Sequence, residues 1–537
     1  MDVIGQKADV SSRWRKFSKV LVLSCLVVVA LDAYPLVGLR SRDDLKASIV
    51  DEWHFIRFIA KCQDALLQGD VTAPFTTGNP CGYGSFYWTS SAIISLPLRI
   101  AGWPTTIIGL RLLSLFFKAL TLAFIVESVG RVRTEQRWIG WVLVALMLSM
   151  PAFAFFGKVI SCEYLLMAMT TAAYWQLLLD SGRWGRSFWI SLFLIGLAVV
   201  TKPNIFWLLF PWVIAWPYCL VAVGIKNALV HTLIVVAATV LLGLHGLCSA
   251  EAMDFMLLGM RANTSGLHWF NLQHLHQWYV FDSLSWEGLP FRGLRSGFIS
   301  FTLIIALGIV TAVGWKASAQ KTILSAALFG PILCITLIMG TQVHHTWYIF
   351  PAVAALLVAV GHSLAALPQS SARHALACVT IILIGNLSMQ ATRIQDHYAR
   401  RIKLNRLVEE NRAVAGPLLE VLRNAPKGSR VLCDHFLPID QLSKERRDLN
   451  WKPCMQIMWD GNAGKAHALC DYIITYQDET YAASPLQTVT SIGQFWSQPA
   501  FDVAGRKWRF ETLAKVNKWQ VLVRHPVDEY AVRADFH

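Results

Sequence analysis

Residues 48–88 read SIVDEWHFIRFIAKCQDALLQGDVTAPFTTGNPCGYGSFYW. This stretch follows the first hydrophobic run of the chain and is polar enough to lie outside lipid. It opens with two carboxylates, and its first apolar residues recur at helical spacing: Ile49, Trp53, Ile56 and Ala60. The spacing predicts an amphipathic helix on a membrane surface. Gly69 and Pro74 are expected to end this helix, and a loop rich in Gly, Thr and Asn then runs to the aromatic residues 86–88.

The composition of the chain is that of a membrane protein. The 537 residues are 55% hydrophobic and only 15% charged, whereas soluble proteins average about 25% charged residues. Apolar runs of membrane-spanning length recur throughout. The first of them, about 20–39, lacks a cleavage site of small residues and is predicted to be a retained helix. The net charge of +14 fits Lys and Arg in cytoplasmic loops near anionic headgroups, and nucleic acid is not an expected partner.

The distribution of Lys and Arg predicts the topology. A basic cluster in residues 7–19 puts the amino terminus in the cytoplasm, and every short loop assigned to that side contains Lys or Arg. The segment Phe86–Gly102 is short and contains Pro97 and Arg99, so it is predicted to be interfacial or re-entrant. The predicted total is about eleven transmembrane helices, with twelve or thirteen as the alternative count. After the first, the predicted spans are 104–127, 138–157, 163–180, 187–202, a run ending at Lys226, 228–247, a run returning to Lys316, 322–341, a run returning to Arg373, and 374–392.

Two domains are predicted. Residues 1–392 form an all-α polytopic membrane module with external loops at 40–103 and 249–294. Residues 393–537 are charged and contain no span, and the topology puts them outside the cytoplasm. A helical pattern at 394–424 and short apolar runs predict a small soluble α/β domain. Its expected strands are Arg430–Cys433, Tyr472–Tyr476 and Trp519–Arg524.

The stretch after the first span resembles the first external loop of the GT-C superfamily of membrane glycosyltransferases. The nearest likeness is to lipid A aminoarabinose transferases and to protein O-mannosyltransferases of the dolichyl-phosphate-mannose-dependent type. Their loop carries Asp-Glu, an aromatic residue, then Ala-x-x-x-Leu-x-x-Gly-Asp-x-x-x-Pro. Here it reads Asp51-Glu52-Trp53-His54-Phe55, then Asp64-Ala65-Leu66-Leu67-Gln68-Gly69-Asp70, then Pro74. The tight match covers about forty residues.

The resemblance implies transfer of a sugar from a polyprenyl-phosphate donor to a hydroxyl acceptor. Such a reaction needs a base for the acceptor proton and positive groups for the departing phosphate. Asp51 matches the catalytic acidic position of the family, with Glu52 as an alternative base or supporting partner. Asp51 also fits a capping box in which Ser48 is the N-cap. The two roles are compatible, because a helix amino terminus favours an ionised carboxylate.

Three charged residues near span ends are further candidates. Glu163 starts the fourth span on the same predicted face as Asp51, where the family carries an acidic residue, although carboxylates at membrane boundaries are often plain interfacial residues. Lys202 lies in Thr-Lys-Pro-Asn between two apolar runs, where it either binds donor phosphate or snorkels to the interface. Arg111 resembles an arginine of the family and either faces the phosphate or pairs with Glu163.

The remaining candidates lie in loops. His344, His345 and Tyr348 precede the tenth span, in a run similar to the Arg/His-Tyr-x-x-Pro of the family, and are candidates for phosphate or acceptor contact. Adjacent histidines on a helix point to different faces, so no metal site is assigned, although a divalent metal stays open as a cofactor. Asn79 stands where the family has a lysine in Lys-Pro-Pro. That departure argues against a true aminoarabinose transferase. Tyr83, in the same loop, is assigned to substrate binding.

The leading hypothesis is a GT-C glycosyltransferase of a bacterial inner (plasma) membrane. Its expected partners are the bilayer, a polyprenyl-phosphate sugar and a glycan, lipid or protein acceptor of the cell envelope, lipopolysaccharide included. One alternative is a transporter or flippase of lipid-linked glycans. Transporters usually show paired repeats and helices broken at the membrane middle, and neither is visible in the sequence. The other alternative is a non-catalytic assembly scaffold.

Overall fold

The structure is a computed structural model in which the chain forms two compact units. The helical unit comprises residues 1–40, 54–284 and 294–394, and the sheet unit comprises 41–53, 285–293 and 395–537. The residues that the structure describes are 3–36, 52–76, 84–149, 160–179, 184–243, 283–284, 294–295, 319–341, 349–366, 413–433, 437, 442–443, 445–453, 470–476, 501–503, 506–517 and 519–526.

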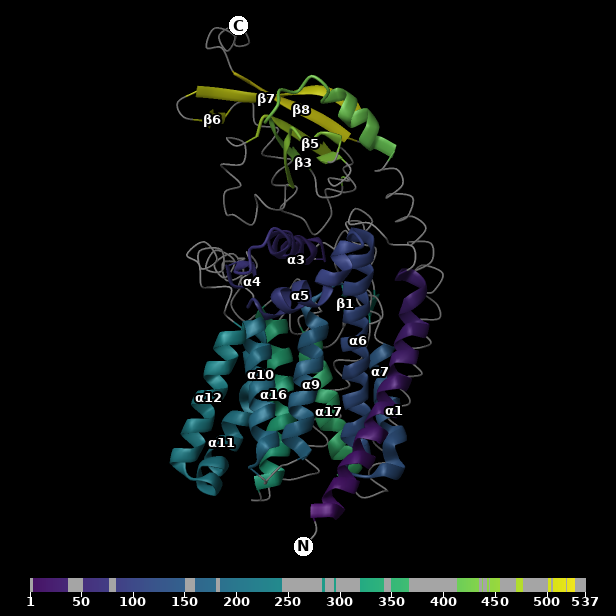
Figure 1. Cartoon of the computed structure of the whole chain (residues 1–537), viewed down its shortest axis with the longest axis vertical. Helices are drawn as coiled ribbons and strands as arrows, with labels where there is room; N and C mark the ends of the chain where they lie inside the picture. Colours follow the sequence, from purple (N-terminus) through teal and green to yellow (C-terminus); the bar gives the residue numbers. More distant parts are fainter. Residues whose placement is uncertain are drawn as a thin grey trace. The chain divides into compact units, whose positions relative to one another are not determined.

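The helical unit is a bundle of long apolar helices (Figure 1). In chain order these are α1 (Val3–Leu36), α6 (Trp103–Gly130), α7 (Arg137–Leu148), α9 (Cys162–Leu179), α10 (Arg186–Thr201), α11 (Phe210–Val223), α12 (Ile225–Gly243), α16 (Ala319–Thr341) and α17 (Phe350–Ala366). Short pieces connect or accompany them: the 3₁₀ helices η1 (Thr134–Gln136) and η2 (Pro203–Leu209), and the antiparallel strands β1 (Ser283–Leu284) and β2 (Leu294–Arg295).

Four stretches in the described part of the chain are long and apolar enough to cross a membrane. They are Thr105–Gly130, Pro203–Val223, Ile225–Gly243 and Gln320–Ile338, and α10 and α17 are shorter apolar helices. The chain is therefore an integral membrane protein. Helices occupy most of the predicted spans, often within three residues of the expected bounds. The total of eleven spans stays a prediction, because the span at 374–392 and much of the run before Lys316 lie outside the described residues.

The packed centre of the bundle is built on α9. Nearly every residue of this helix is buried, and α17 is buried along almost its whole length. The hydroxyl of Thr170 on α9 donates to the carbonyl of Pro351 on α17 (3.3 Å). The Tyr174 hydroxyl donates to the carbonyl of Leu208 in η2 (3.1 Å). α9 contacts α6, α10 and α17, so this helix is held from several sides.

A buried carboxylate braces the corner between α6 and α7. The Glu127 carboxylate forms ion pairs with Arg137 (2.9 Å) and with the Nε of Arg131 (3.7 Å). The Arg131 guanidinium also lies over the ring of Trp175 on α9, 5.4 Å from its centroid. Arg131 and Arg137 therefore tie α6, α7 and α9 together.

The predicted amphipathic helix is α3 (Glu52–Leu67), which is followed by α4 (Ala73–Thr76) and α5 (Phe86–Ile100). We call α3, α4 and α5 the first-loop platform; Figure 1 shows it at one end of the bundle. The expected apolar face is buried at Ile56 and Ala60. Gly69 follows the helix with φ +92°, as expected of a helix-ending glycine. The expectation for Pro74 is wrong, because Pro74 lies inside α4, where a proline near a helix start loses no hydrogen bond.

Side chains dock α3 onto α5. The buried amide of Gln63 donates to the Ala92 carbonyl (3.1 Å) and to the Ser95 hydroxyl (2.8 Å). The ring of Phe55 stacks on Trp88 with centroids 4.7 Å apart. Within the described residues α5, a helix of 15 residues, is not among the helices long and apolar enough to span a membrane, and the interfacial position of 86–102 stays a prediction.

The sheet unit contains a mixed six-stranded sheet in the order β4-β3-β5-β8-β7-β6. Its strands are β3 (Arg430–Cys433), β4 (Asn450–Pro453), β5 (Tyr472–Tyr476), β6 (Phe501–Val503), β7 (Arg506–Val516) and β8 (Trp519–Pro526). β3 pairs in parallel with β4 and β5, and the other pairs are antiparallel. β3 and β5 have the bounds predicted from the sequence, and β8 extends two residues beyond its predicted end.

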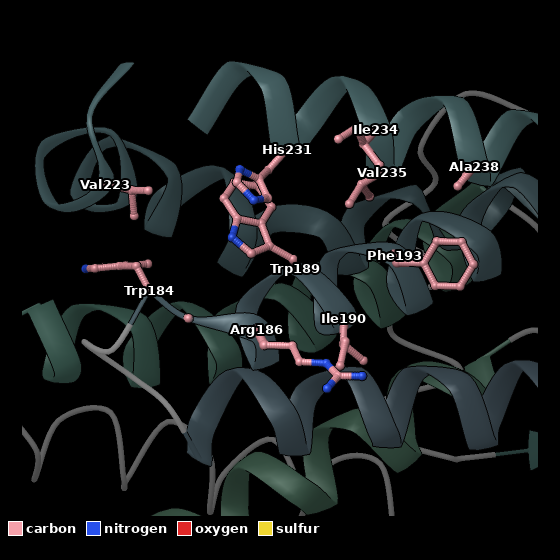
Figure 2. A pocket seen from close by; sticks show the side chains of 11 residues that line it. Trp184, Arg186, Trp189, Ile190, Phe193, Val223, His231, Ile234, Val235 and Ala238 are labelled. Atoms are coloured by element: carbon pink, nitrogen blue, oxygen red, sulfur yellow. The ribbon is translucent and has the colours of Figure 1, made fainter. Parts of the chain in front are cut away.

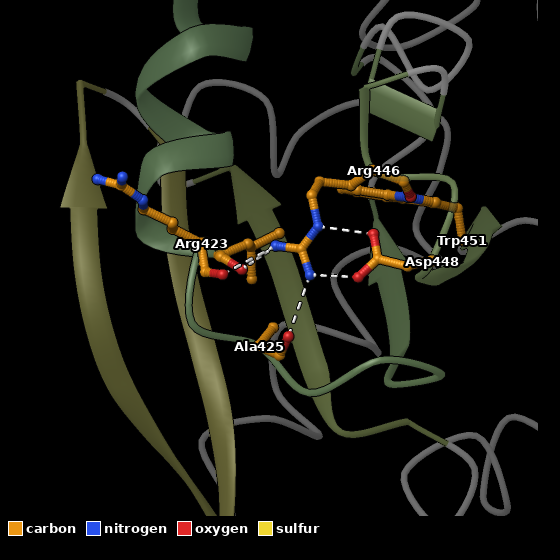
Figure 3. A network of polar contacts seen from close by, with 6 residues as sticks. Arg423, Ala425, Arg446, Asp448 and Trp451 are labelled. Carbon is orange, nitrogen blue, oxygen red and sulfur yellow. Dashed lines mark hydrogen bonds and ion pairs between the residues drawn. The ribbon is translucent and has the colours of Figure 1, made fainter.

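A helix at 413–421 packs on this sheet. Its Leu418 is buried with Val431, Ile474 and Trp519 in one apolar cluster. Figure 3 shows how the end of the helix is held. The Arg446 guanidinium donates to the carbonyls of Leu422 (2.6 Å) and Ala425 (3.0 Å) and also bonds both oxygens of Asp448 (2.7 and 2.8 Å). One arginine therefore satisfies carbonyls that the helix leaves open at its end.

Candidate active site at the junction of α9 and α10

A buried ion pair joins two helix ends in the bundle. The Lys202 ammonium contacts Oε1 of Glu163. Lys202 is 1% exposed and Glu163 is 3% exposed. An ionisable pair buried in a membrane bundle is costly and commonly marks a functional site. Both residues were candidates from the sequence, and the structure brings them together.

Lys202 owes its position to the proline that follows it. α10 ends at Thr201, Lys202 is extended (φ −146°, ψ 96°), and Pro203 starts η2. The residue before a proline is disfavoured in the α region, so the helix stops there. The Lys202 amide still donates to the Ala198 carbonyl (3.0 Å). The break therefore turns a side chain at a span end back into the bundle.

Glu163 is oriented by the first turn of α9. The hydroxyl of Ser161 donates to Oε2 of Glu163, and the Glu163 amide donates to the same hydroxyl oxygen (3.3 Å). The Cys162 thiol lies 3.4 Å from Oε2. Both carboxylate oxygens thus have partners, Oε1 on Lys202 and Oε2 on Ser161. Ser161 was not among the site residues predicted from the sequence. A Ser two residues before an acidic residue at a helix start is a pattern typical of an N-cap and could have identified it.

The end of the first loop meets the bundle beside this pair. The Gly84 amide donates to the Thr201 carbonyl (3.0 Å), one residue before Lys202, and the Ser85 amide donates to the Gly243 carbonyl (2.8 Å). A Cβ on Gly84 would stand 2.5 Å from the Val200 carbonyl oxygen, which is closer than any real contact. A glycine is therefore required for this backbone to approach so closely, and the sequence analysis missed it.

Two further cations are buried on α6. Arg111 and Lys118 are each 1% exposed, and their spacing of seven residues puts them on one helix face. Arg111 was a candidate from the sequence, whereas Lys118 was not, although it is a charged residue inside a predicted span. The ion pair that the structure gives Glu163 is with Lys202.

The other candidates fall outside the part of the chain that the structure describes. Glu52 begins α3, but its side chain is not among the described ones. Positions without description are Asp51, Asn79, Tyr83, His344, His345 and Tyr348. Their roles, and the capping box at Ser48, stay predictions. Within the described residues, no group of three or more His, Cys, Asp and Glu side chains is arranged to hold a metal ion.

Several solved structures are similar to this chain, at low identity and with TM-scores below 0.5. ArnT from Cupriavidus metallidurans in the apo state has a TM-score of 0.43 and 11% identity, covering 96% of this chain and 98% of that one. The same protein bound to undecaprenyl phosphate has a TM-score of 0.42 and 11% identity, covering 95% and 98%. The Archaeoglobus fulgidus oligosaccharyltransferase in the apo form has a TM-score of 0.43 and 11% identity, covering 87% and 70%.

No protein-family model and no curated protein matches the chain. At this level of identity, the activity of the chain has to be argued from its own residues.

Proposed function

We propose that this protein is an integral-membrane glycosyltransferase. It would move a sugar from a polyprenyl-phosphate carrier to a hydroxyl of a glycan, lipid or protein of the cell envelope. The observation that carries the proposal is the buried Glu163–Lys202 pair, one residue from the point where Gly84, at the end of the first loop, bonds to Thr201. That loop carries the Asp51-Glu52 motif.

The proposed reaction is a displacement at the sugar. Asp51, or Glu52 in its place, accepts the proton of the acceptor hydroxyl as its oxygen attacks the anomeric carbon. The bond from that carbon to the phosphate oxygen breaks, and the polyprenyl phosphate leaves with the electron pair. Positive side chains that meet the developing charge lower the barrier. We assign this role to Lys202 and Arg111.

The contacts of Lys202 fit such a role. An ammonium group has three donor hydrogens, so Lys202 can keep its bond to Glu163 while it donates to a phosphate oxygen. Glu163, held by Ser161, fixes the direction of the lysine side chain. In this proposal Glu163 positions the phosphate-binding lysine. The first-loop residues Asn79 and Tyr83 would contact the substrate, as would His344, His345 and Tyr348. No metal is assigned.

The proposed topology extends the predicted one. The amino terminus lies in the cytoplasm, eleven spans form the module 1–392, and residues 393–537 form a small α/β domain on the outer side of a bacterial inner membrane. The mixed sheet at 430–526 supports the α/β part of this proposal. An outer-face active site agrees with a carrier lipid whose sugar is presented on that face.

Deletion of the gene, followed by mass spectrometry of surface glycans, tests the proposed class of reaction. The proposal predicts that one sugar disappears from one envelope component and returns with the wild-type gene. The Asp51→Asn gene should express and insert but fail to restore the sugar. An unchanged glycan profile in the deletion strain would contradict the proposal.

Binding of undecaprenyl phosphate to the purified protein tests the phosphate-binding residues. Lys202→Met and Arg111→Met should weaken binding by about tenfold or more each, since a hydrogen bond to a charged group contributes about 1.5–3 kcal/mol. Lys226→Gln is the matched control, because it removes a positive charge from the exposed start of α12. Unchanged binding by both Met variants would show that Lys202 and Arg111 do not bind the phosphate and have a structural role only.

A further inference from the structure

A groove of about 580 Å³ lies between the first half of α10 and the middle of α12. Figure 2 shows side chains from both helices facing it. Its walls are mostly aromatic and aliphatic: Trp189 and Phe193 from α10, and Ile234 and Val235 from α12. Such a lining is suited to a hydrocarbon chain and offers little to a polar solute.

One side chain, Arg186, gives the groove a positive charge. Arg186 starts α10, and His231 lies on α12, and both line the groove. No Asp or Glu is among the described residues that line it. His231 stacks on Trp189 with ring centroids 5.0 Å apart. Its Nδ1 lies 2.7 Å from the Asn227 carbonyl oxygen, so Nδ1 is the donor and, in the neutral ring, Nε2 is an acceptor.

The surface around the groove is apolar and faces outward. α12 is one of the stretches able to cross a membrane, and on it Leu233 is 67% exposed, with Leu229, Val230 and Ile234 also exposed. A surface of this kind is stable against lipid tails and not against water. The occupant of the groove is therefore expected to come from the bilayer.

The groove is separate from the candidate active site. Arg186 and Thr201 are the two ends of α10, a helix of 16 residues, which spans about 24 Å at 1.5 Å per residue. Lys202 follows the far end. A ligand headgroup beside Arg186 therefore lies near the opposite membrane boundary from the Glu163–Lys202 pair.

We propose that this groove binds an anionic glycerophospholipid. An acyl chain lies against Phe193, Ile234 and Val235, and the phosphate meets the Arg186 guanidinium. Trp184 and Trp189 lie where the headgroup region meets the hydrocarbon, the usual place of tryptophan in membrane proteins. Charge selects the headgroup, because an Arg at a membrane boundary attracts anionic lipid.

Native mass spectrometry of the delipidated full-length protein tests the site. Dioleoyl phosphatidylglycerol and dioleoyl phosphatidylcholine are added separately, and the dissociation constant of the first bound lipid is measured. We expect phosphatidylglycerol to bind about tenfold more tightly. Arg186→Gln should remove that preference, since the lost bond is to a charged group, and Arg186→Lys should keep part of it.

Two further variants test whether the lipid binds in the groove and whether the preference depends on Arg186 and not on positive charge in general. Val235→Trp fills the groove and should abolish tight binding of both lipids, provided that its unfolding temperature is unchanged. Lys226→Gln removes a positive charge five residues before His231 without touching the groove lining and should bind as the wild type does. Equal affinity for the two lipids, or a preference that survives both Arg186→Gln and Val235→Trp, would overturn the proposal.

Discussion

Lys202 and Glu163 form a buried ion pair that ties the carboxyl end of α10 to the amino end of α9. The two residues are 39 positions apart, and both are almost fully buried. The pair contributes to both stability and proposed function, so the two contributions have to be separated by experiment.

A double-mutant cycle separates them. Lys202→Met and Glu163→Gln should each destabilise the protein by about 3–5 kcal/mol, because each leaves one buried charge without its partner. The double variant should regain most of that stability but not transfer activity, since no cation remains for the phosphate. Unfolding temperature and sugar transfer are measured side by side in nanodiscs. A double variant as active as the wild type would show that the pair is structural only.

Gly84→Ala tests whether the first loop must meet the bundle at this point. The added Cβ would stand 2.5 Å from the Val200 carbonyl oxygen and 2.8 Å from that of Gly243, so the loop must shift. A displacement of about 1 Å can cost about 10²-fold in rate, and we expect a loss of that order in transfer. Gly416→Ala is the control, because nothing lies within 4 Å of its Cβ. Full activity in Gly84→Ala would show that sugar transfer does not depend on the position of the first loop at this contact.

The Arg446–Asp448 pair predicts acid sensitivity in the sheet unit. The hydrogen bonds from Arg446 lower the pKa of Asp448 below its ordinary value. Because the pKa of Asp448 is lower in the folded than in the unfolded protein, the ionised carboxylate stabilises the folded state at pH values above the unfolded pKa of about 4. This stabilisation is lost as the pH falls through the pKa that Asp448 has in the folded protein. The difference in unfolding temperature between wild type and Asp448→Asn should therefore be clear at pH 7 and shrink steadily as the pH is lowered below about 4.

The exposed pair Arg423–Glu420 is the control for that experiment. Its side chains are 74% and 70% exposed, and exposed pairs on a helix contribute only about 0.3–0.5 kcal/mol. Glu420→Gln should thus change the unfolding temperature little at any pH. If Asp448→Asn behaves in the same way, Arg446 holds the helix end without help from Asp448.

The topology predicts where the carboxyl terminus lies. Eleven spans after a cytoplasmic start leave residue 537 outside. A reporter active only in the cytoplasm, fused after His537, should therefore be silent, and the same reporter fused before Val3 should be active. An active reporter at the carboxyl end would mean that the span count is wrong by one, with a full crossing at 86–102 as the first suspect.

The sequence predicted the helices well, because apolar runs and the positions of Lys and Arg determine spans locally. α6, α9 and α10 begin within one residue of their expected starts. In the sheet, β3 and β5 are apolar and were predicted, whereas β7 was missed. β7 reads RKWRFETLAKV, and its many charges mask the alternation that identifies a strand.

The partnerships in the site could not be read from the sequence. Lys202 and Glu163 were both candidates, but which acidic residue meets the lysine is decided by the packing of α9 against α10. The tight contact of Gly84 with Val200 depends on two segments more than 100 residues apart in the chain. Gln63 looks like a solvent-facing polar residue of α3, and only the docking of α3 on α5 explains its burial.

The most direct test of the account is transfer activity and unfolding temperature measured together for purified Asp51→Asn. Glu52→Gln serves as the neighbouring comparison, and Asp64→Asn, which alters the partly exposed pair with Arg99, as the control. Loss of a cap costs on the order of 1 kcal/mol, whereas loss of a general base costs about 10²–10⁴-fold in rate. The account predicts that Asp51→Asn unfolds near the wild-type temperature and transfers sugar about 10²–10⁴-fold more slowly. Near-normal transfer with only a lower unfolding temperature would contradict it.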